Sequence, residues 1–316
     1  MTSNTIMIIS DRSIFNKITI TIALLLTVLL HAQKPINTDD FKIADRIAAA
    51  PQNIFTKFRE AGMDPVMHDL TRAEAEKVEK AFAMMPPLHR KMLKKHLHSI
   101  SFMDNMPNTA LTSEVKDENS DVKKFNITFR AEILHETISQ WATTKENTVY
   151  DSTRDPGFQV VVEAGNLDAI VYVLLHEATH VIDAVLNLTP HPDDRNALVE
   201  PTAFTRDIWH KMNEPVPTFV TSILASTRFR NGTALASTSA VEAYRALGKT
   251  PFVSLYAMAS WFEDLAEIVT IFHLTKHLDQ PFAIVVRKHN IEIFRFEPMK
   301  NKFVEARLKQ LALFYS

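Results

Sequence analysis

The sequence predicts an α+β protein that is predominantly helical. Glycine is scarce, at five of 316 residues, whereas the helix formers Leu, Ala, Lys, Glu and Met are plentiful. A few segments instead alternate apolar and polar residues, as Phe125, Ile127 and Phe129 do with their neighbours, which is the signal of a strand. An apolar content of 46% is enough to bury a sizeable core as one large domain or two small ones.

The composition excludes several classes of protein. The formal net charge is only −2, so the sequence lacks the basic footprint of a nucleic-acid binder and we expect no nucleic-acid partner. Cysteine is absent, which rules out disulfides, thiolate catalysis and cysteine-ligated zinc. Any metal site must therefore be built from histidines and carboxylates.

The first 32 residues have the layout of a secretory signal peptide. Arg12 and Lys17 precede an apolar run at 18–30, and the small residue Ala32 follows it. At ~1.5 Å per residue this run falls short of the roughly 30 Å hydrocarbon core, so we expect no stable membrane span after cleavage near Ala32. The predicted location is therefore secreted or periplasmic; the alternative is a buried N-terminal helix.

Residues 33–150 are predicted to form a mainly helical N-terminal region with a few strands, in the same domain as the remainder or closely packed on it. Apolar residues at helical spacing, a proline break at Pro51 and a capping box of Thr71 with Glu74 support the first helices. The expected elements are helices at 38–60 (interrupted at Pro51), 71–85, 88–98 and 133–145, a strand from 99 followed by a loop to 115, a surface loop at 116–124, and a strand at 125–130.

Residues 151–316 are predicted to form the catalytic region. Its longest helix should begin at Asn166, a good N-cap, and continue to about Leu188. The other expected elements are a strand at 158–162, a proline-rich connector with a helix at 204–212, a helix opening at Thr250, a long helix at 261–277, a hairpin of 283–286 with 291–296, and a C-terminal helix at 301–314.

The helix from Asn166 contains the pattern His-Glu-x-x-His. His176 and His180 are four residues apart, so both imidazoles lie on one helical face and can reach one metal ion. Glu177 is turned away from them by about a quarter of the circumference, where it can accept a proton from a water that zinc has made more acidic. The alternative is a chance match, but two histidines and a glutamate on an apolar helix are costly to bury unless they are paired or metal-bound.

A catalytic zinc needs a third protein ligand and an open position. A metzincin would require glycine and histidine where this chain has Asp183 and Leu186, which excludes that class. Glu263 and Glu267 lie one turn apart on the helix at 261–277, so one can bind the metal while the other holds a ligating histidine. Glu263 could instead serve only a capping box with Ser260. Asp183 shares the histidine face and could ligate, although we expect it to orient a ligand.

The His-Glu-x-x-His pattern followed by a downstream Glu-x-x-x-Glu resembles the gluzincin superfamily of zinc metallopeptidases. Tyr256, seven residues before Glu263, resembles the lethal-factor-type subgroup at its second metal helix. The resemblance covers the two helices and departs from the subgroup at Asp264, where Phe or Tyr is common. It implies a zincin-like catalytic domain with a small β-sheet and an active-site helix. The site residues it implies are the zinc ligands His176, His180 and Glu263, the general base Glu177, and Tyr256 as a donor to the oxyanion.

The expected function is a secreted or periplasmic zinc-dependent peptidase that hydrolyses peptide bonds of a peptide or protein substrate, with Glu177 as general base. One alternative is a zinc hydrolase that acts on a non-peptide amide or ester. Another is a non-catalytic secreted helical binding protein. We also expect the strand at 158–162 to be an edge strand that pairs with an extended substrate.

Overall fold

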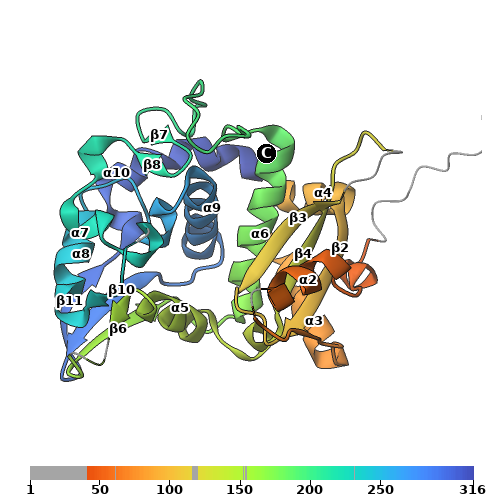
Figure 1. The fold of residues 1–316 in the computed structure, drawn as a ribbon, viewed down its shortest axis with the longest axis horizontal. Helices are drawn as coiled ribbons and strands as arrows, with labels where there is room; N and C mark the ends of the chain where they lie inside the picture. Colours follow the sequence, from red (N-terminus) through yellow and green to blue (C-terminus); the bar gives the residue numbers. More distant parts are fainter. Residues whose placement is uncertain (1–40, 61, 116–119, 152, 154, 231) are drawn as a thin grey trace, which may run out of the picture. The chain divides into compact units, whose positions relative to one another are not determined.

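The computed structural model describes residues 41–60, 62–115, 120–151, 153, 155–230 and 232–316. The signal peptide predicted for residues 1–32 lies outside the described residues. Residues 42–316 form one compact unit, which combines helices with small sheets (Figure 1). The α+β class expected from the sequence is therefore confirmed.

The first half of this unit alternates short helices and strands. Its elements are a 3-10 helix Ile43–Arg46, α2 (Gln52–Glu60), β1 (Val66–Met67), α3 (Arg72–Ala83), α4 (Pro87–His96), β2 (Leu97–Asp104), β3 (Ala110–Val115), β4 (Lys124–Arg130), a 3-10 helix Ala131–His135, α5 (Ile138–Asn147) and β5 (Tyr150–Asp151). The predicted capping box at the start of α3 is confirmed. The Thr71 side chain accepts from the backbone N–H of Glu74, and the Glu74 carboxylate accepts from that of Thr71.

The second half contains the two longest helices. Its elements are β6 (Phe158–Glu163), α6 (Ala169–Leu186), β7 (Trp209–Lys211), β8 (Glu214–Pro215), a 3-10 helix Pro217–Phe219, α7 (Ser222–Ala225), a 3-10 helix Arg228–Arg230, β9 (Leu235–Ala236), a 3-10 helix Ser237–Ser239, α8 (Ala240–Leu247), a 3-10 helix Tyr256–Met258, α9 (Trp261–His277), β10 (Ala283–Lys288), β11 (Ile291–Phe296), a 3-10 helix Pro298–Lys300, α10 (Lys302–Glu305) and a 3-10 helix Leu308–Tyr315. The predicted limits of α9 and the hairpin of β10 with β11 are confirmed.

Several expected elements differ in the structure. The helix predicted before Pro51 is a single 3-10 turn, because Ile47 leaves helical geometry to form a bridge with Ile100. The predicted loop before residue 115 is strand β3, which pairs along its whole length with β4. The N-cap of α6 is Asp168 and not Asn166.

The remaining differences lie in the second half. The helix expected at 204–212 is a series of turns followed by β7, no helix opens at Thr250, and the C-terminal helix is divided into α10 and a 3-10 helix. The helix α8 was not anticipated.

The larger sheet has the strand order β1-β2-β4-β3, with β2 parallel to β4 and the other neighbours antiparallel. Its two outer strands are β1 and β3. The second sheet has the order β11-β10-β6 and is antiparallel throughout. The turn between β10 and β11 places His289 and Asn290 at φ angles of 50° and 65°, the left-handed conformation that tight hairpins need.

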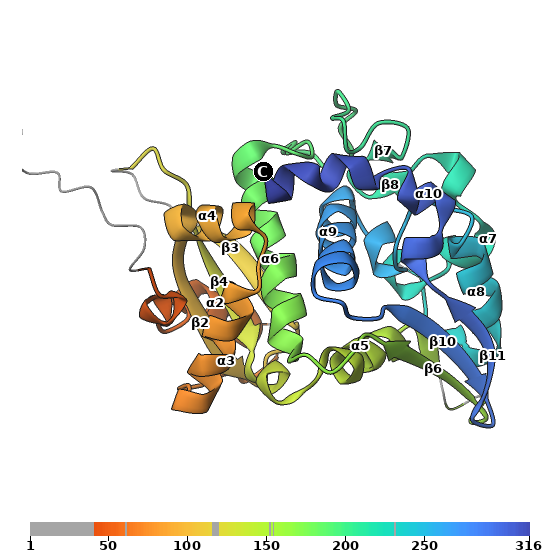
Figure 2. The same ribbon diagram turned by 180° about the vertical axis from the view of Figure 1, so that it is seen from behind.

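Helix α6 is the central element of the unit. Helices α3 and α4 and strand β3 contact it from one side, while α5 and α9 contact it from the other (Figures 1 and 2). It is long and apolar enough to cross a membrane by length and composition, but 78% of it is buried against these neighbours, as in a core helix. This burial requires a partner for each polar side chain on α6.

The start of α9 is held by a buried ion pair. The Arg307 guanidinium donates to both carboxylate oxygens of Asp264 at 2.9 and 2.8 Å, and Trp209 Nε1 donates to Asp264 Oδ2 at 2.9 Å. Arg307 also donates to the carbonyl of Pro251 at 2.8 Å. Asp264 is fully buried, so the first turn of α9 is tied to both the C-terminal segment and the β7 region.

We expect Arg307→Leu to lower the free energy of unfolding by about 3–5 kcal/mol, because it leaves the Asp264 carboxylate buried without its counter-charge. Urea denaturation followed by circular dichroism measures this change. Lys300→Met is the matched control, because Lys300 is 74% exposed and pairs with Glu297 at the surface, so its loss should change stability little. Equal stability of Arg307→Leu and the wild type would contradict the assignment.

Candidate metal centre

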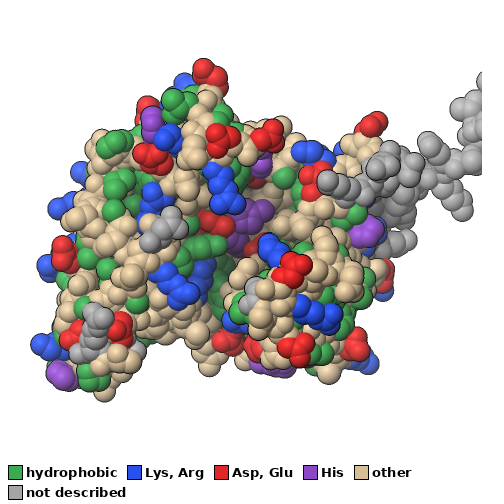
Figure 3. Space-filling model, in the orientation of Figure 1, with side chains coloured by type: hydrophobic (Ala, Val, Ile, Leu, Met, Phe, Trp, Pro, Cys, Tyr) green, Lys and Arg blue, Asp and Glu red, His purple; other side chains and the backbone are tan. Residues whose placement is uncertain are grey.

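The helix α6 presents both histidines of the motif on one face, as the four-residue spacing requires. Their rings lie edge to face, with centroids 4.9 Å apart and an interplanar angle of 81°. His176 is 6% exposed and His180 is half-buried. Figure 3 shows a group of histidine side chains at the bottom of a hollow in this face of the molecule. His176 lines one cavity and His180 lines another, so the two imidazoles are not enclosed in the core.

Glu263, in the first turn of α9, meets these histidines. Its Oε2 lies 3.0 Å from Nε2 of His176 and 3.6 Å from Nε2 of His180. The backbone N–H of Glu263 donates to the Ser260 side chain, so Ser260 is a true N-cap. The Glu263 carboxylate, however, faces the histidines, so a capping role alone does not explain it.

The geometry of these three residues fits a metal ion. In a tetrahedral site with bonds of about 2.0–2.1 Å, neighbouring ligand atoms are about 3.3 Å apart. The two nitrogen–oxygen distances, 3.0 and 3.6 Å, lie on either side of this value. All three ligand atoms lie within 4.8 Å of one another. His176, His180 and Glu263 can thus hold one metal ion, with two imidazoles and a carboxylate as its donors.

Glu267, one turn further along α9, supports His176 from behind. Its Oε1 lies 3.3 Å from Nδ1 of His176, which has no other partner among the described residues. The same oxygen accepts from Tyr172 at 2.8 Å, and Oε2 accepts from Ser254 at 2.7 Å. Glu267 occupies the place of the carboxylate that orients a ligating histidine through its second ring nitrogen.

The electrostatics of the centre favour positive charge. Burial alone would lower the pKa of His176, but Glu263 and Glu267 overcome this and raise the pKa to about 9. Burial likewise opposes ionisation of Glu267, yet Lys145 and then His176 lower its pKa to about 2. His180 and His176 hold the pKa of Glu263 well below its usual range. A divalent cation would take the place of the histidine protons, because a ligating imidazole must be neutral.

Glu177 lies beside the three ligands but is held by a different element. Thr112, on the edge strand β3, donates to Oε2 of Glu177 at 2.6 Å. Glu177 is 8% exposed and lines both cavities at the centre. Thr112 was not singled out from the sequence, and no local pattern could have revealed it, because it comes from a strand 65 positions earlier in the chain.

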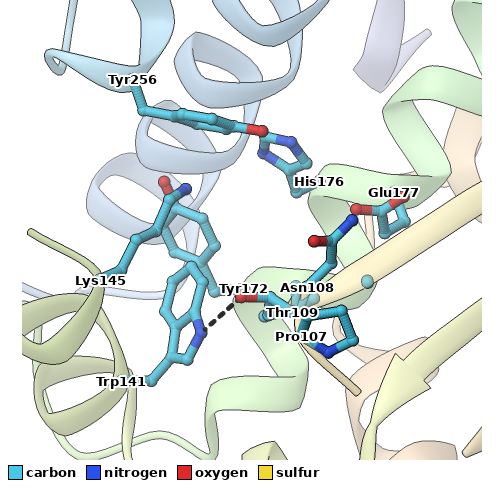
Figure 4. Close-up of a pocket in the computed structure, with 11 residues that line it drawn as sticks. Pro107, Asn108, Thr109, Trp141, Lys145, Tyr172, His176, Glu177 and Tyr256 are labelled. Atoms are coloured by element: carbon cyan, nitrogen blue, oxygen red, sulfur yellow. Dashed lines mark hydrogen bonds between the residues drawn. The ribbon is translucent and has the colours of Figure 1, made fainter. Parts of the chain in front are cut away.

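Tyr256 lies against His176, with ring centroids 6.0 Å apart (Figure 4). The backbone N–H that follows it, on Ala257, donates to Ser254, whose hydroxyl donates to Glu267. Burial and the nearby carboxylates, above all Glu263, raise the pKa of Tyr256 well above its usual value. Tyr256 therefore keeps its phenolic proton and can act as a hydrogen-bond donor.

Two cavities meet at these residues. One, of about 310 Å³, extends toward α5 and is lined by Lys145, Trp141 and Tyr172. The other, of about 440 Å³, extends along β3 and the C-terminal half of α6. Both are lined by Glu177 and Tyr256. The three candidate ligands thus lie where the two cavities meet.

The carboxylate of Asp183 is engaged by residues other than the three candidate ligands. Its two carboxylate oxygens accept from the backbone and side chain of Thr189, at 2.7 and 2.6 Å, and Oδ2 lies 3.3 Å from Nε2 of His191. Asp183 therefore shapes the loop that follows α6. His191, which has no partner at metal-ligand spacing in the sequence, packs against Phe262 and lines the larger cavity.

No family model matches this chain, and neither the curated proteins nor the solved structures contain a significant match to it.

We expect the wild type to bind close to one equivalent of zinc. Glu263→Ala should bind zinc over ~100-fold more weakly, which exceeds the loss typical when a residue that only orients a metal ligand is removed. Equilibrium dialysis against buffered zinc, with metal analysis, measures both values. Glu242→Ala is the control, because Glu242 is an exposed acid on α8. Unchanged affinity in Glu263→Ala would exclude Glu263 as a ligand.

Proposed function

We propose that this chain is a secreted or periplasmic zinc-dependent peptidase of the gluzincin type, with a zincin-like catalytic region. The observation that carries the proposal is the convergence of His176, His180 and Glu263 beside the carboxylate of Glu177. Two imidazoles and one carboxylate are a donor set used for catalytic zinc. The placement of the centre between two cavities supports a role in catalysis over a purely structural one.

In this proposal His176, His180 and Glu263 hold the zinc, which when bound supplies Lewis-acid chemistry for amide hydrolysis. Glu177 takes the proton of the attacking water and passes it to the leaving amine. Thr112 keeps one oxygen of Glu177 engaged, which leaves the other free for this transfer. Tyr256 donates to the carbonyl oxygen as negative charge develops on it.

The strand that lies along the proposed substrate path is β3. It is one of the two outer strands of its sheet, and its residues Ala110, Leu111 and Thr112 line the larger cavity. β6 is at the edge of its own sheet, as expected from the sequence, but it lines neither of the two cavities at the metal centre. An extended peptide would therefore pair with β3 and not with β6, as main-chain recognition at a sheet edge requires.

We expect Glu177→Gln to lower kcat by at least about 10²–10⁴-fold while zinc binding is retained, because the amide cannot accept the proton of the attacking water. A peptide mixture analysed by mass spectrometry measures hydrolysis, and a parallel panel of non-peptide esters and amides tests the alternative hydrolase. Glu242→Gln is the control. Full peptidase activity of zinc-loaded Glu177→Gln would refute the mechanism.

We expect Tyr256→Phe to lower kcat by about 10²–10³-fold with little change in KM, because the lost hydrogen bond forms only as charge develops on the substrate oxygen. Steady-state kinetics on one cleaved peptide give the two constants, and dialysis gives the zinc content. A change confined to KM would assign Tyr256 to substrate binding.

A further inference from the structure

The smaller cavity beside the metal centre carries a chemical signature of its own. Its volume is about 310 Å³, and its walls come from α5, α6 and the loop between β2 and β3. Figure 4 shows Lys145, Trp141 and Tyr256 on one wall and Asn108 with Thr109 on the other. Glu177 and His176 close the end where the two cavities meet. A group bound here would lie directly beside the bond that the proposed peptidase cleaves.

Lys145 is the one Lys or Arg among the described residues that line this cavity. Its Nζ lies 3.6 Å from the centroid of the Tyr256 ring and 5.2 Å from that of Trp141. It also lies 3.5 Å from Oε1 of Glu267. The two rings and the carboxylate fix the position of the ammonium, so it is a positioned charge and not a mobile surface lysine.

The Lys145 ammonium still has donors to offer. It has three N–H groups, and no hydrogen bond from them to any described residue is formed. Its side chain is 22% exposed, which leaves it open to the cavity. Glu267 is shared with Tyr172 and Ser254, which already donate to its two oxygens. A second carboxylate, from a ligand, could therefore accept from Lys145 without displacing Glu267.

The larger cavity is the more acidic of the two. It is lined by Glu114, Asp183 and Glu263, which do not line the smaller cavity, and by Glu177, which lines both; no Lys or Arg is among its described lining residues. A substrate that spans both cavities thus meets Lys145 on one side of the candidate metal centre and three further acids on the other. This asymmetry favours an acidic group in the smaller cavity and disfavours one in the larger cavity.

We infer that the smaller cavity is a subsite for a carboxylate of the substrate, which accepts a charge-assisted hydrogen bond from Lys145 while its carbon chain packs on Trp141 and Tyr172. This inference rests on the proposed peptidase function and names its substrate class: peptides with an acidic side chain, or a free C-terminal carboxylate, next to the cleaved bond. Lys145 acts here as a specificity-determining residue.

Three pooled peptide mixtures test this inference on the full-length, zinc-loaded protein. The first contains Asp or Glu and has an amidated C-terminus, the second has neutral side chains and a free C-terminal carboxylate, and the third is neutral and amidated. The other positions are randomised in all three. We expect kcat/KM for the first or the second mixture to exceed that for the third by about 10–100-fold, as befits a hydrogen bond to a charged group. Which of the two is preferred identifies the source of the carboxylate.

Variants of the lysine give a second measurement. In zinc-loaded Lys145→Met, kcat/KM should be about equal for the mixtures with and without a carboxylate. Lys145→Arg should keep the preference for the carboxylate, because the charge is retained. Lys91→Met, at an exposed position on α4, should leave the preference unchanged. Since Lys145 also supports Glu267, zinc content is measured for each variant, and the wild-type preference stands as a test even if Lys145→Met loses metal.

The outcomes separate the two proposals. Hydrolysis of all three mixtures at equal rates would overturn the carboxylate subsite and leave the peptidase function standing. A preference that survives in zinc-loaded Lys145→Met would assign the recognition to another residue and also overturn the inference. Failure to cleave any mixture would refute the peptidase function, and with it the subsite.

Discussion

The packing of α6 against α9 is the contact on which the rest of the site depends. Between these helices lie His176, Glu263 and Glu267, ionisable groups that are costly to bury unless each finds a partner. The observed pairs belong to this register, and sliding by one helical turn, about 5.4 Å, would break them. The long apolar surfaces of the two helices provide the burial that holds the register.

The register of α9 is fixed in turn by residues that take no part in the metal centre. Asp264 follows Glu263 directly and faces a different side of the same helical turn. Its bidentate pair with Arg307 ties this turn to the C-terminal segment. Trp209 adds a third bond to this carboxylate. The contacts of Asp264 therefore hold the first turn of α9 in place, and Glu263 extends from the same turn toward the histidines. This role explains an acid at the position where the resemblance led us to expect an aromatic residue.

The sequence revealed the parts of the site that depend on local spacing. The four-residue interval predicted the paired imidazoles, and the cap at Ser260 with the apolar pattern behind it predicted α9 from end to end. It missed Thr112, Lys145 and Arg307, because their roles come from contacts 43 or more positions away along the chain. Strand β3 was missed for a related reason: its residues are nearly all half-buried, so no apolar alternation marks it, and pairing with β4 makes it a strand.

Lys145 connects the wall of the smaller cavity to the metal centre itself. Its ammonium lowers the pKa of Glu267, and Glu267 lies against Nδ1 of His176. The positive charge that would receive a substrate carboxylate therefore also keeps ionised the carboxylate that supports a candidate metal ligand. A residue at position 145 thus cannot be exchanged for specificity without changing the basicity of His176. On the opposite side, β3 contributes Thr112 to Glu177 and its edge to the larger cavity, so base and substrate path are joined there too. In the proposed peptidase, recognition and chemistry would share the same side chains on both sides of the centre, which would tie the substrate that this fold accepts to the groups that cleave it.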